Sequence, residues 1–174
     1  MLSINTVAQI HHKIGDVEIT IRPMTSEDKE IESSFVQHLS FESKHNRFLE
    51  GINELSPTML KRLCDFDGKT AMAFVATIQH EDKEQQIGVS RYATDPDTNE
   101  SEMAVTVADE WQHHGIAKLL MQPLIEYAKN NGITALYSID LVSNTGMHHL
   151  ANDLGMSSEQ VPDDARLRKY ILKI

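Results

Sequence analysis

Three shortages in this 174-residue sequence narrow what the protein can be. A single cysteine, Cys64, cannot form an intramolecular disulfide and has no second thiol with which to build a CxxC redox or zinc site. Basic residues are few, 16 against 26 acidic ones, and the net charge of -10 disfavours binding to nucleic acid or to an anionic membrane. No apolar run approaches the roughly 18 residues of a membrane-spanning helix. We therefore expect neither nucleic acid nor membrane as a partner.

The length and composition fit one globular domain, since 40% of the residues are hydrophobic and 24% are charged. The first residues lack a basic segment followed by an apolar one, so no secretory signal is predicted and a cytoplasmic location is the default. We expect residues 1–16 to form an irregular N-terminal arm and residues 17–174 to form the domain. The sequence leaves open whether the protein is a monomer or a homodimer.

Hydrophobic patterning predicts a mixed α/β chain. Alternation at period two and turn residues indicate strands near residues 17–23, 70–80, 86–94, 101–109, 133–140 and 166–174. Capping residues and helical spacing indicate helices near residues 25–39, 56–64, 115–130 and 145–154. The three consecutive strands between residues 70 and 109 are expected to form an antiparallel meander. Pro123 should kink the third helix or split it.

The stretch E-W-Q-H-H-G-I-A-K-L-L, residues 110–120, joins an apolar strand to a helix through a short loop that contains Gly115. This order places unpaired backbone N–H groups, from about His114 to Lys118, and the positive end of a helix dipole at the loop. A side chain at position 115 would hold a phosphate away from that backbone. The pattern therefore predicts an anion-binding site.

Residues 112–117 fit the pattern Q/R-x-x-G-x-G/A and resemble the pyrophosphate loop of the GNAT superfamily of acyl-CoA-dependent N-acyltransferases. The I-R-P segment at Ile21, the strand before the loop, and the spacing of Asn144 and Gly155 extend the resemblance over nearly the whole chain. Residues 39–48, 55–60 and 88–105 are similar, in order, to segments of the Pat-type protein-lysine acetyltransferase domains. We expect from this a GNAT acetyltransferase.

The resemblance implies an α/β (α+β) GNAT fold with a mostly antiparallel, mixed sheet of about six or seven strands and about four helices. The sheet should splay between its fourth and fifth strands, which end near Asp109 and begin near Ile133, and the cosubstrate acetyl-CoA should enter that gap. No metal is expected. The resemblance assigns acetyl-CoA binding to Val105, Thr106, Val107, Gln112, His113, His114, Gly115, Ile116, Ala117, Lys118 and Asn144.

Transfer to an amine requires a base, because a lysine with a pKa of about 10.4 is protonated at pH 7. Removal of its proton costs about 4.6 kcal/mol. Glu102 is the candidate: it opens the strand that leads to the loop, and it matches an acidic position of the Pat-type domains. Strand alternation puts Glu102, Ala104 and Thr106 on one face. Backbone groups around residues 105–107 would polarise the thioester carbonyl, as the resemblance implies.

Each site residue also has a structural interpretation. Glu102 could be a solvated strand-edge acid, Asn144 a helix N-cap, and His114 a solvated flank instead of a phosphate contact. Arg47 and Arg91 could form surface ion pairs, and Trp111 could pack against the core. The three adjacent histidine pairs lack the i, i+4 spacing of a zinc helix.

Two functions remain open from the sequence. The first is an N-acetyltransferase acting by direct attack in a ternary complex, because Cys64 matches no position of the motif. Its acceptor would be a protein lysine, for example on an acyl-CoA synthetase, or a small-molecule amine. The second is a non-catalytic acyl-CoA sensor. Many GNAT enzymes carry a tyrosine seven residues after the asparagine, and Ala151 stands there in this sequence, so the general acid stays unassigned.

Overall fold

The computed structural model describes residues 7–49 and 54–174, and its centre is a sheet of eight strands in the order β1-β2-β3-β4-β5-β6-β8-β7. All neighbouring strands are antiparallel except β5 and β6, which run parallel. The strands are β1 (Ile10–Ile14), β2 (Val17–Pro23), β3 (Ala71–His80), β4 (Lys83–Thr94), β5 (Ser101–Val107), β6 (Ala135–Leu141), β7 (Ser157–Gln160) and β8 (Leu167–Lys173).

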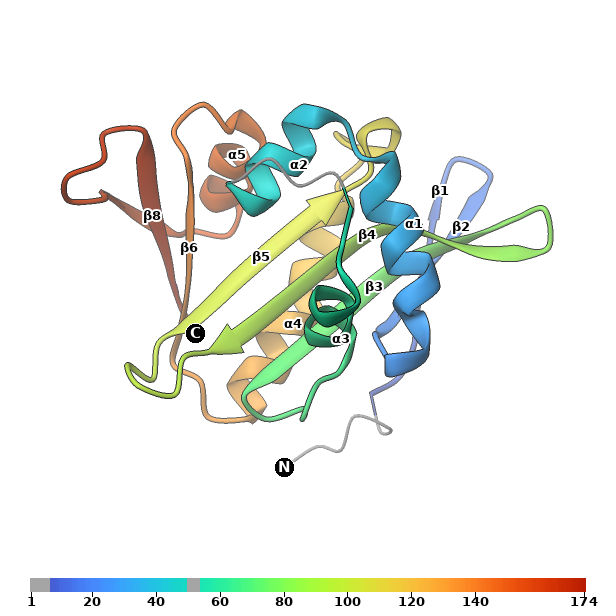
Figure 1. The fold of residues 1–174 in the computed structure, drawn as a ribbon, viewed down its shortest axis with the longest axis horizontal. Helices are drawn as coiled ribbons and strands as arrows, with labels where there is room; N and C mark the ends of the chain where they lie inside the picture. The colour runs from blue at the N-terminus through green and yellow to red at the C-terminus, as the bar shows by residue number, and fades with distance from the viewer. Residues whose placement is uncertain (1–6, 50–53) are drawn as a thin grey trace.

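Five α-helices accompany the sheet in the described part of the chain: α1 (Lys29–His38), α2 (Phe41–Phe48), α3 (Pro57–Cys64), α4 (Ile116–Asn130) and α5 (Thr145–Asp153). Helices α1, α2 and α3 lie on one face of the sheet and α4 crosses the opposite face (Figure 1). One apolar core lies between the sheet and α4 with α5, and a second lies beneath α1 and α3. Within residues 7–49 and 54–174, no helix has both the length and the apolarity to span a bilayer.

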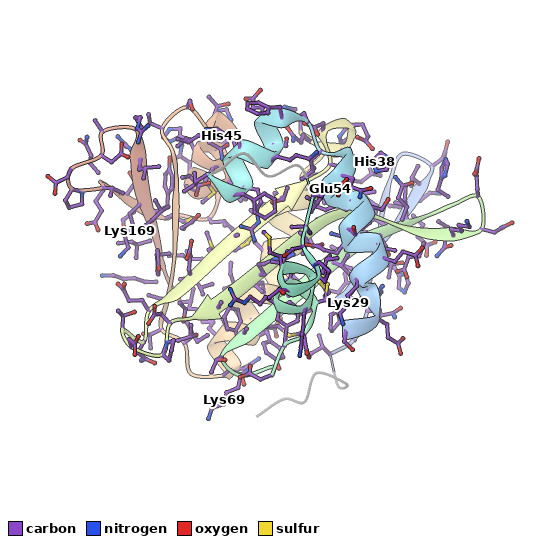
Figure 2. The ribbon with its side chains drawn as sticks, viewed as in Figure 1. Lys29, His38, His45, Glu54, Lys69 and Lys169 are labelled. Carbon is purple, nitrogen blue, oxygen red and sulfur yellow. The ribbon has the colours of Figure 1, made fainter. Side chains whose placement is uncertain are left out.

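The predicted splay is present, between β5 and β6. A single residue pair, Glu102 and Tyr137, joins these strands, and beyond it the edge of β5 toward β6 is unpaired. Nζ of Lys169, on β8, lies 4.5 Å from the centroid of the Tyr137 ring. Figure 2 labels Lys169 at this end of the sheet. The splay separates the fifth and sixth strands instead of the fourth and fifth, because β1 adds one strand at the N-terminal end of the sheet.

Three elements correct the sequence-based expectations. Residues 1–16 were expected to form an irregular arm, and this is wrong for the part that forms β1. Strand β1 pairs antiparallel with β2 through a tight turn at Gly15 (φ +59°). Residues 1–6 lie outside the described residues. Helix α2 and the exposed edge strand β7 were also not expected, so the sheet and the helices each exceed the predicted number.

Helix α4 is continuous through Pro123, so of the two outcomes expected there, a kink or a split, the split does not occur. It packs closely on β4, where a Cβ atom added to Gly88 would lie 2.9 Å from Cδ1 of Leu120. The hydroxyl of Ser90, also on β4, donates to the carbonyl oxygen of Leu120 at 2.9 Å. These contacts fix the first turns of α4, and with them the loop that precedes the helix.

Candidate active site

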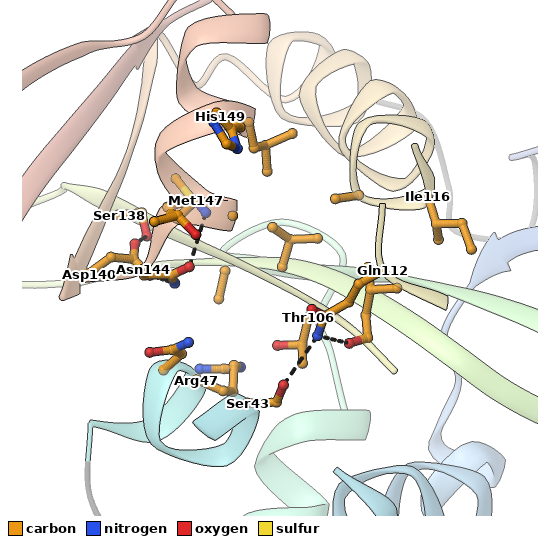
Figure 3. A pocket seen from close by; sticks show the side chains of 18 of the residues that line it. Ser43, Arg47, Thr106, Gln112, Ile116, Ser138, Asp140, Asn144, Met147 and His149 are labelled. Carbon is orange, nitrogen blue, oxygen red and sulfur yellow. Dashed lines mark hydrogen bonds between the residues drawn. The ribbon is translucent and has the colours of Figure 1, made fainter. Parts of the chain in front are cut away.

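A cleft of about 730 Å³ opens where β5 and β6 separate. Three parts of the chain form its walls: β5 with the loop that follows it, β6 with α5, and helix α2 (Figure 3). It contains every residue assigned to the site from the sequence except His114. These are Glu102, Val105, Thr106, Val107, Gln112, His113, Gly115, Ile116, Ala117, Lys118 and Asn144.

The loop before α4 has the geometry of an anion cradle. His113 and Gly115 both have left-handed backbone conformations, with φ of +63° and +79°. Gly115 is the N-cap of α4 and supplies no capping side chain, so the first N–H groups of the helix have no intrahelical partner. A Cβ atom at Gly115 would meet nothing within 4 Å, so the space in front of the loop is open. Lys118 adds a positive charge in the first turn of α4.

Two side chains of the loop are engaged within the protein. Nε2 of Gln112 donates to the carbonyl oxygen of Val107 and to Oγ of Ser43, both at 3.2 Å. Nδ1 of His114 donates to the carbonyl oxygen of Gln112 at 2.7 Å, and its ring tilts against Trp111. His114 is exposed and does not line the cleft, so the geometry favours its interpretation as a solvated flank.

Asp109 ties this loop to α2, a role that sequence reasoning missed. Its carboxylate accepts hydrogen bonds from the backbone N–H of Ser40 (2.9 Å), the hydroxyl of Ser40 (2.6 Å) and the hydroxyl of Ser43 (2.8 Å). Partial burial raises the pKa of Asp109, but these hydrogen bonds outweigh burial and hold the pKa below its usual value. The signal in the sequence was Ser40, an N-cap residue in front of an unrecognised helix.

Glu102 lies at the apex of the splay, the point where β5 and β6 are still paired before they separate. It is exposed, lines the cleft, and is the β5 residue paired with β6. The next residue, Met103, is 1% exposed and belongs to the core beneath α4, so Glu102 faces the side of the sheet that carries α1, α2 and α3. Thr106 shares that face, and its buried hydroxyl has no hydrogen-bond partner among the described residues. A carboxylate and an unpaired hydroxyl therefore face one open space.

The opposite wall carries a second carboxylate that the sequence did not indicate. Asp140 of β6 is 8% exposed and accepts hydrogen bonds from the hydroxyl of Ser138 and from Nδ2 of Asn144, the latter at 3.3 Å. Burial raises the pKa of Asp140, and the two hydrogen bonds and the charge of Arg47 only partly oppose this. Oδ1 of Asn144 caps α5 by accepting from the N–H of Met147 at 3.0 Å. The N-cap interpretation of Asn144 is thus confirmed.

Several groups outside the cleft limit the chemistry available. Cys64 is 1% exposed, and burial raises the pKa of its thiol to about 11. Ala151 is 2% exposed and offers no proton. Arg91, for which a surface ion pair was considered, forms a buried pair with Glu32 at 2.6 Å. Among the described residues no group of three or more His, Cys, Asp or Glu could hold a metal ion.

Comparisons with known proteins identify the family. The model of the acetyltransferase (GNAT) family matches residues 36–156. A curated relative, acetyltransferase PA5475 of Pseudomonas aeruginosa, is 40% identical over 147 residues, which make up 84% of this chain and 79% of that protein.

Solved structures have the same fold. The GNAT domain of S. lividans PAT has a TM-score of 0.85 and 23% identity, with 95% of this chain and 97% of that one covered. A cAMP-binding acyltransferase from Mycobacterium smegmatis has a TM-score of 0.63 and 20% identity, and the match covers 96% of this chain but 48% of that one. Fold, family model and curated relative agree, and the chain belongs to the GNAT acetyltransferase family.

Proposed function

We propose that this protein transfers the acetyl group of acetyl-CoA to the side-chain amine of a protein lysine, by direct attack in a ternary complex with Glu102 as the general base. The observation that carries the proposal is the position of Glu102, an exposed carboxylate at the apex of the β5–β6 splay. The resemblance of residues 39–48, 55–60 and 88–105 to segments of the Pat-type protein-lysine acetyltransferase domains supports the choice of acceptor. The net charge of -10 suits a lysine-bearing surface.

The residues present fit acetyl-CoA. The open space in front of Gly115 and the unpaired N–H groups at the start of α4 suit its phosphates. The unpaired edge of β5 and the unpartnered hydroxyl of Thr106 offer donors and acceptors to its amide-containing arm. A cleft of about 730 Å³ also leaves room for an acceptor side chain. Bound there, acetyl-CoA would supply an activated thioester.

The reaction then needs three things from the chain. Glu102 accepts the proton that the acceptor ammonium releases, so that deprotonation, which costs a free lysine about 4.6 kcal/mol at pH 7, takes place where the amine attacks. Backbone N–H groups of β5 near Val105 and Val107 donate to the carbonyl oxygen as it gains negative charge. The departing thiolate, with a pKa of about 8.5, takes its proton from water, because Ala151 offers none.

Direct attack is supported by the state of the one thiol. Cys64 does not line the cleft, is 1% exposed, and has a pKa of about 11. Only a thiolate is a competent nucleophile, so this cysteine is a poor carrier for an acetyl group. The amine therefore attacks the thioester itself, with both substrates bound together.

A thiol-release assay with a panel of lysine proteins, lysine peptides and small amines tests the proposal. Glu102→Gln should lower kcat by about 10²- to 10⁴-fold and leave the Kd for acetyl-CoA unchanged. The matched control is Glu100→Gln, which removes the same charge from a residue that pairs with Lys169 at 3.3 Å and does not line the cleft. Binding of acetyl-CoA with no thiol release from any amine would instead identify a sensor.

A further inference from the structure

Arg47 projects from α2 into the cleft, and none of the described residues accepts a hydrogen bond from it. It is half-buried, and Figure 3 shows its side chain opposite Asp140 and Asn144. The guanidinium carbon lies 5.0 Å from the centroid of the Phe48 ring. Within residues 7–49 and 54–174, Arg47 has no hydrogen bond and no ion pair, although a guanidinium carries five N–H donors. The surface ion pair considered for Arg47 is absent from these residues.

The charge of Arg47 persists at neutral pH. Burial lowers its pKa, and the positive charge of Arg91 lowers it further, to about 10. The negative charges of Glu32, Glu102 and Asp140 act in the other direction. Because the pKa stays well above 7, the half-buried guanidinium is charged, and its N–H donors have no acceptor among the described residues.

The acids near Arg47 do not supply the missing acceptor. Glu32 is 1% exposed and already bonds Arg91 and Gln86, each at 2.6 Å. Asp140 accepts from Ser138 and Asn144 on the far wall of the cleft. These carboxylates attract Arg47 through space, but a cation held partly away from water is stabilised much more by a direct, charge-assisted hydrogen bond.

Arg47 lies on the side of the cleft that is free for the acceptor. Helix α2 covers the same face of the sheet as α1 and α3, and Glu102 points toward that face. The anion cradle lies instead at the start of α4, the helix on the opposite face. The phosphates of acetyl-CoA therefore have their own site, and the free donors of Arg47 face the approach to Glu102.

An acceptor that approaches here meets both signs of charge. Glu102 attracts the ammonium of a lysine, whereas Arg47 repels it. A ligand that carries a carboxylate close to its amine satisfies both groups, and a guanidinium binds a carboxylate through two parallel N–H···O bonds. We propose that Arg47 binds a carboxylate of the acceptor, the side chain of an aspartate or glutamate within about three residues of the reacting lysine. This inference rests on the proposed function, because it specifies the acceptor of the same site.

Paired peptides test this proposal. Each peptide has one lysine in an uncharged sequence with blocked termini, and is made as a Glu/Gln pair with the varied residue at one position from three before to three after the lysine. Two readouts are used: thiol release with acetyl-CoA, and calorimetric binding of the lysine-acetylated peptide to the protein with coenzyme A. At one position or more, the Glu member should be favoured by about 10- to 100-fold in kcat/KM or in affinity.

Variants assign that preference to Arg47. Arg47→Gln should abolish the difference between the Glu and Gln peptides. Arg47→Lys, which keeps the charge and loses the planar fork, should retain part of it. The control is Lys44→Gln, which removes the same charge from the same helix at a residue that does not line the cleft and should keep the full preference. Thermal unfolding of each variant verifies that it folds.

The outcomes separate this proposal from the proposed function. A preference for Glu peptides that survives Arg47→Gln, or the lack of any preference in both readouts, overturns the role of Arg47. Thiol release without a Glu preference overturns the role of Arg47 but is consistent with the proposed lysine acetylation. Binding that depends on Glu, with no thiol release from any peptide, rejects lysine acetylation and supports the site at Arg47.

Discussion

Replacement of Asp109 by asparagine should weaken the binding of both substrates. Its carboxylate holds Ser40 and Ser43 of the α2 region through three hydrogen bonds of 2.6–2.9 Å, and it lies in the loop that leads to Gly115. Asparagine has one acceptor oxygen, so at least one donor loses its partner and the other bonds lose their charge assistance. Loss of a hydrogen bond amounts to about 0.5–1.5 kcal/mol, and water offsets part of it at this exposed site.

The expected total is about 1–2 kcal/mol, equivalent to a factor of about 5–30 in the population of the docked arrangement. We expect the Kd for acetyl-CoA, measured by calorimetry, and the KM for the acceptor, measured by thiol release, to rise by up to that factor. The effect on kcat should be smaller, since Asp109 does not contact the apex at Glu102. Glu110→Gln, an equal change of charge at the adjacent exposed residue, is the control.

The pH dependence follows from the sign of the shift. The folded-state pKa of Asp109 lies below its usual value, so the carboxylate stabilises the folded state at every pH above about 4. That contribution is lost as the pH falls through the depressed pKa. The effect of Asp109→Asn should therefore be constant between about pH 6 and pH 9. A change in only one substrate's constant, or in neither, would refute the linkage between the loop and α2.

Two further substitutions test the chemistry and the packing. Cys64→Ala should keep kcat within about twofold, and mass spectrometry of the wild-type protein with acetyl-CoA should detect no acetylated cysteine; loss of transfer or a trapped thioester would contradict direct attack. Gly88→Ala places a Cβ 2.9 Å from Cδ1 of Leu120 and should lower stability by about 1–3 kcal/mol, measured as a fall in Tm of about 2–12 °C. Gly146→Ala, whose Cβ would make an ordinary contact at 3.6 Å, should leave Tm nearly unchanged.

The sequence predicted those parts of the fold whose apolar pattern is local and strong. The meander of β3, β4 and β5, the helix after Gly115 and the helix capped by Asn144 were all expected and are all present. Each combines a regular apolar period with a turn or cap signal, so the local pattern and the tertiary packing agree.

The elements that the sequence missed bury little apolar surface. All but one residue of β1 are exposed, and α2 has no buried residue, so neither contributes a buried side chain to the apolar core. The turn at Gly15 and Asp16 was a usable signal, since Gly-Asp between two strands is typical of a two-residue hairpin. Helix α2 depends instead on Asp109, 69 residues after Ser40. No local pattern reports a contact at that separation.

The candidate site divides in the same way. The loop around Gly115 could be found because a backbone shape demands particular residues at fixed spacing. Arg47 and Asp140 could not, because their roles come from the burial and charges around them, and these depend on how α2 and β6 meet across the cleft. Sequence reasoning assigned Arg47 and Arg91 the same interpretation, although one lies in the cleft and the other in a buried ion pair.

The single residue pair between β5 and β6 also affects how cooperatively the two parts of the sheet unfold. It divides the sheet into a block of five strands and a block of three, and only Glu102 and Tyr137 continue the hydrogen-bond ladder across the gap. Two parts of a protein unfold less cooperatively when few contacts join them. A ligand that fills this gap contacts both blocks at once. Substrate binding should therefore add contacts between the two blocks and stabilise one against the other.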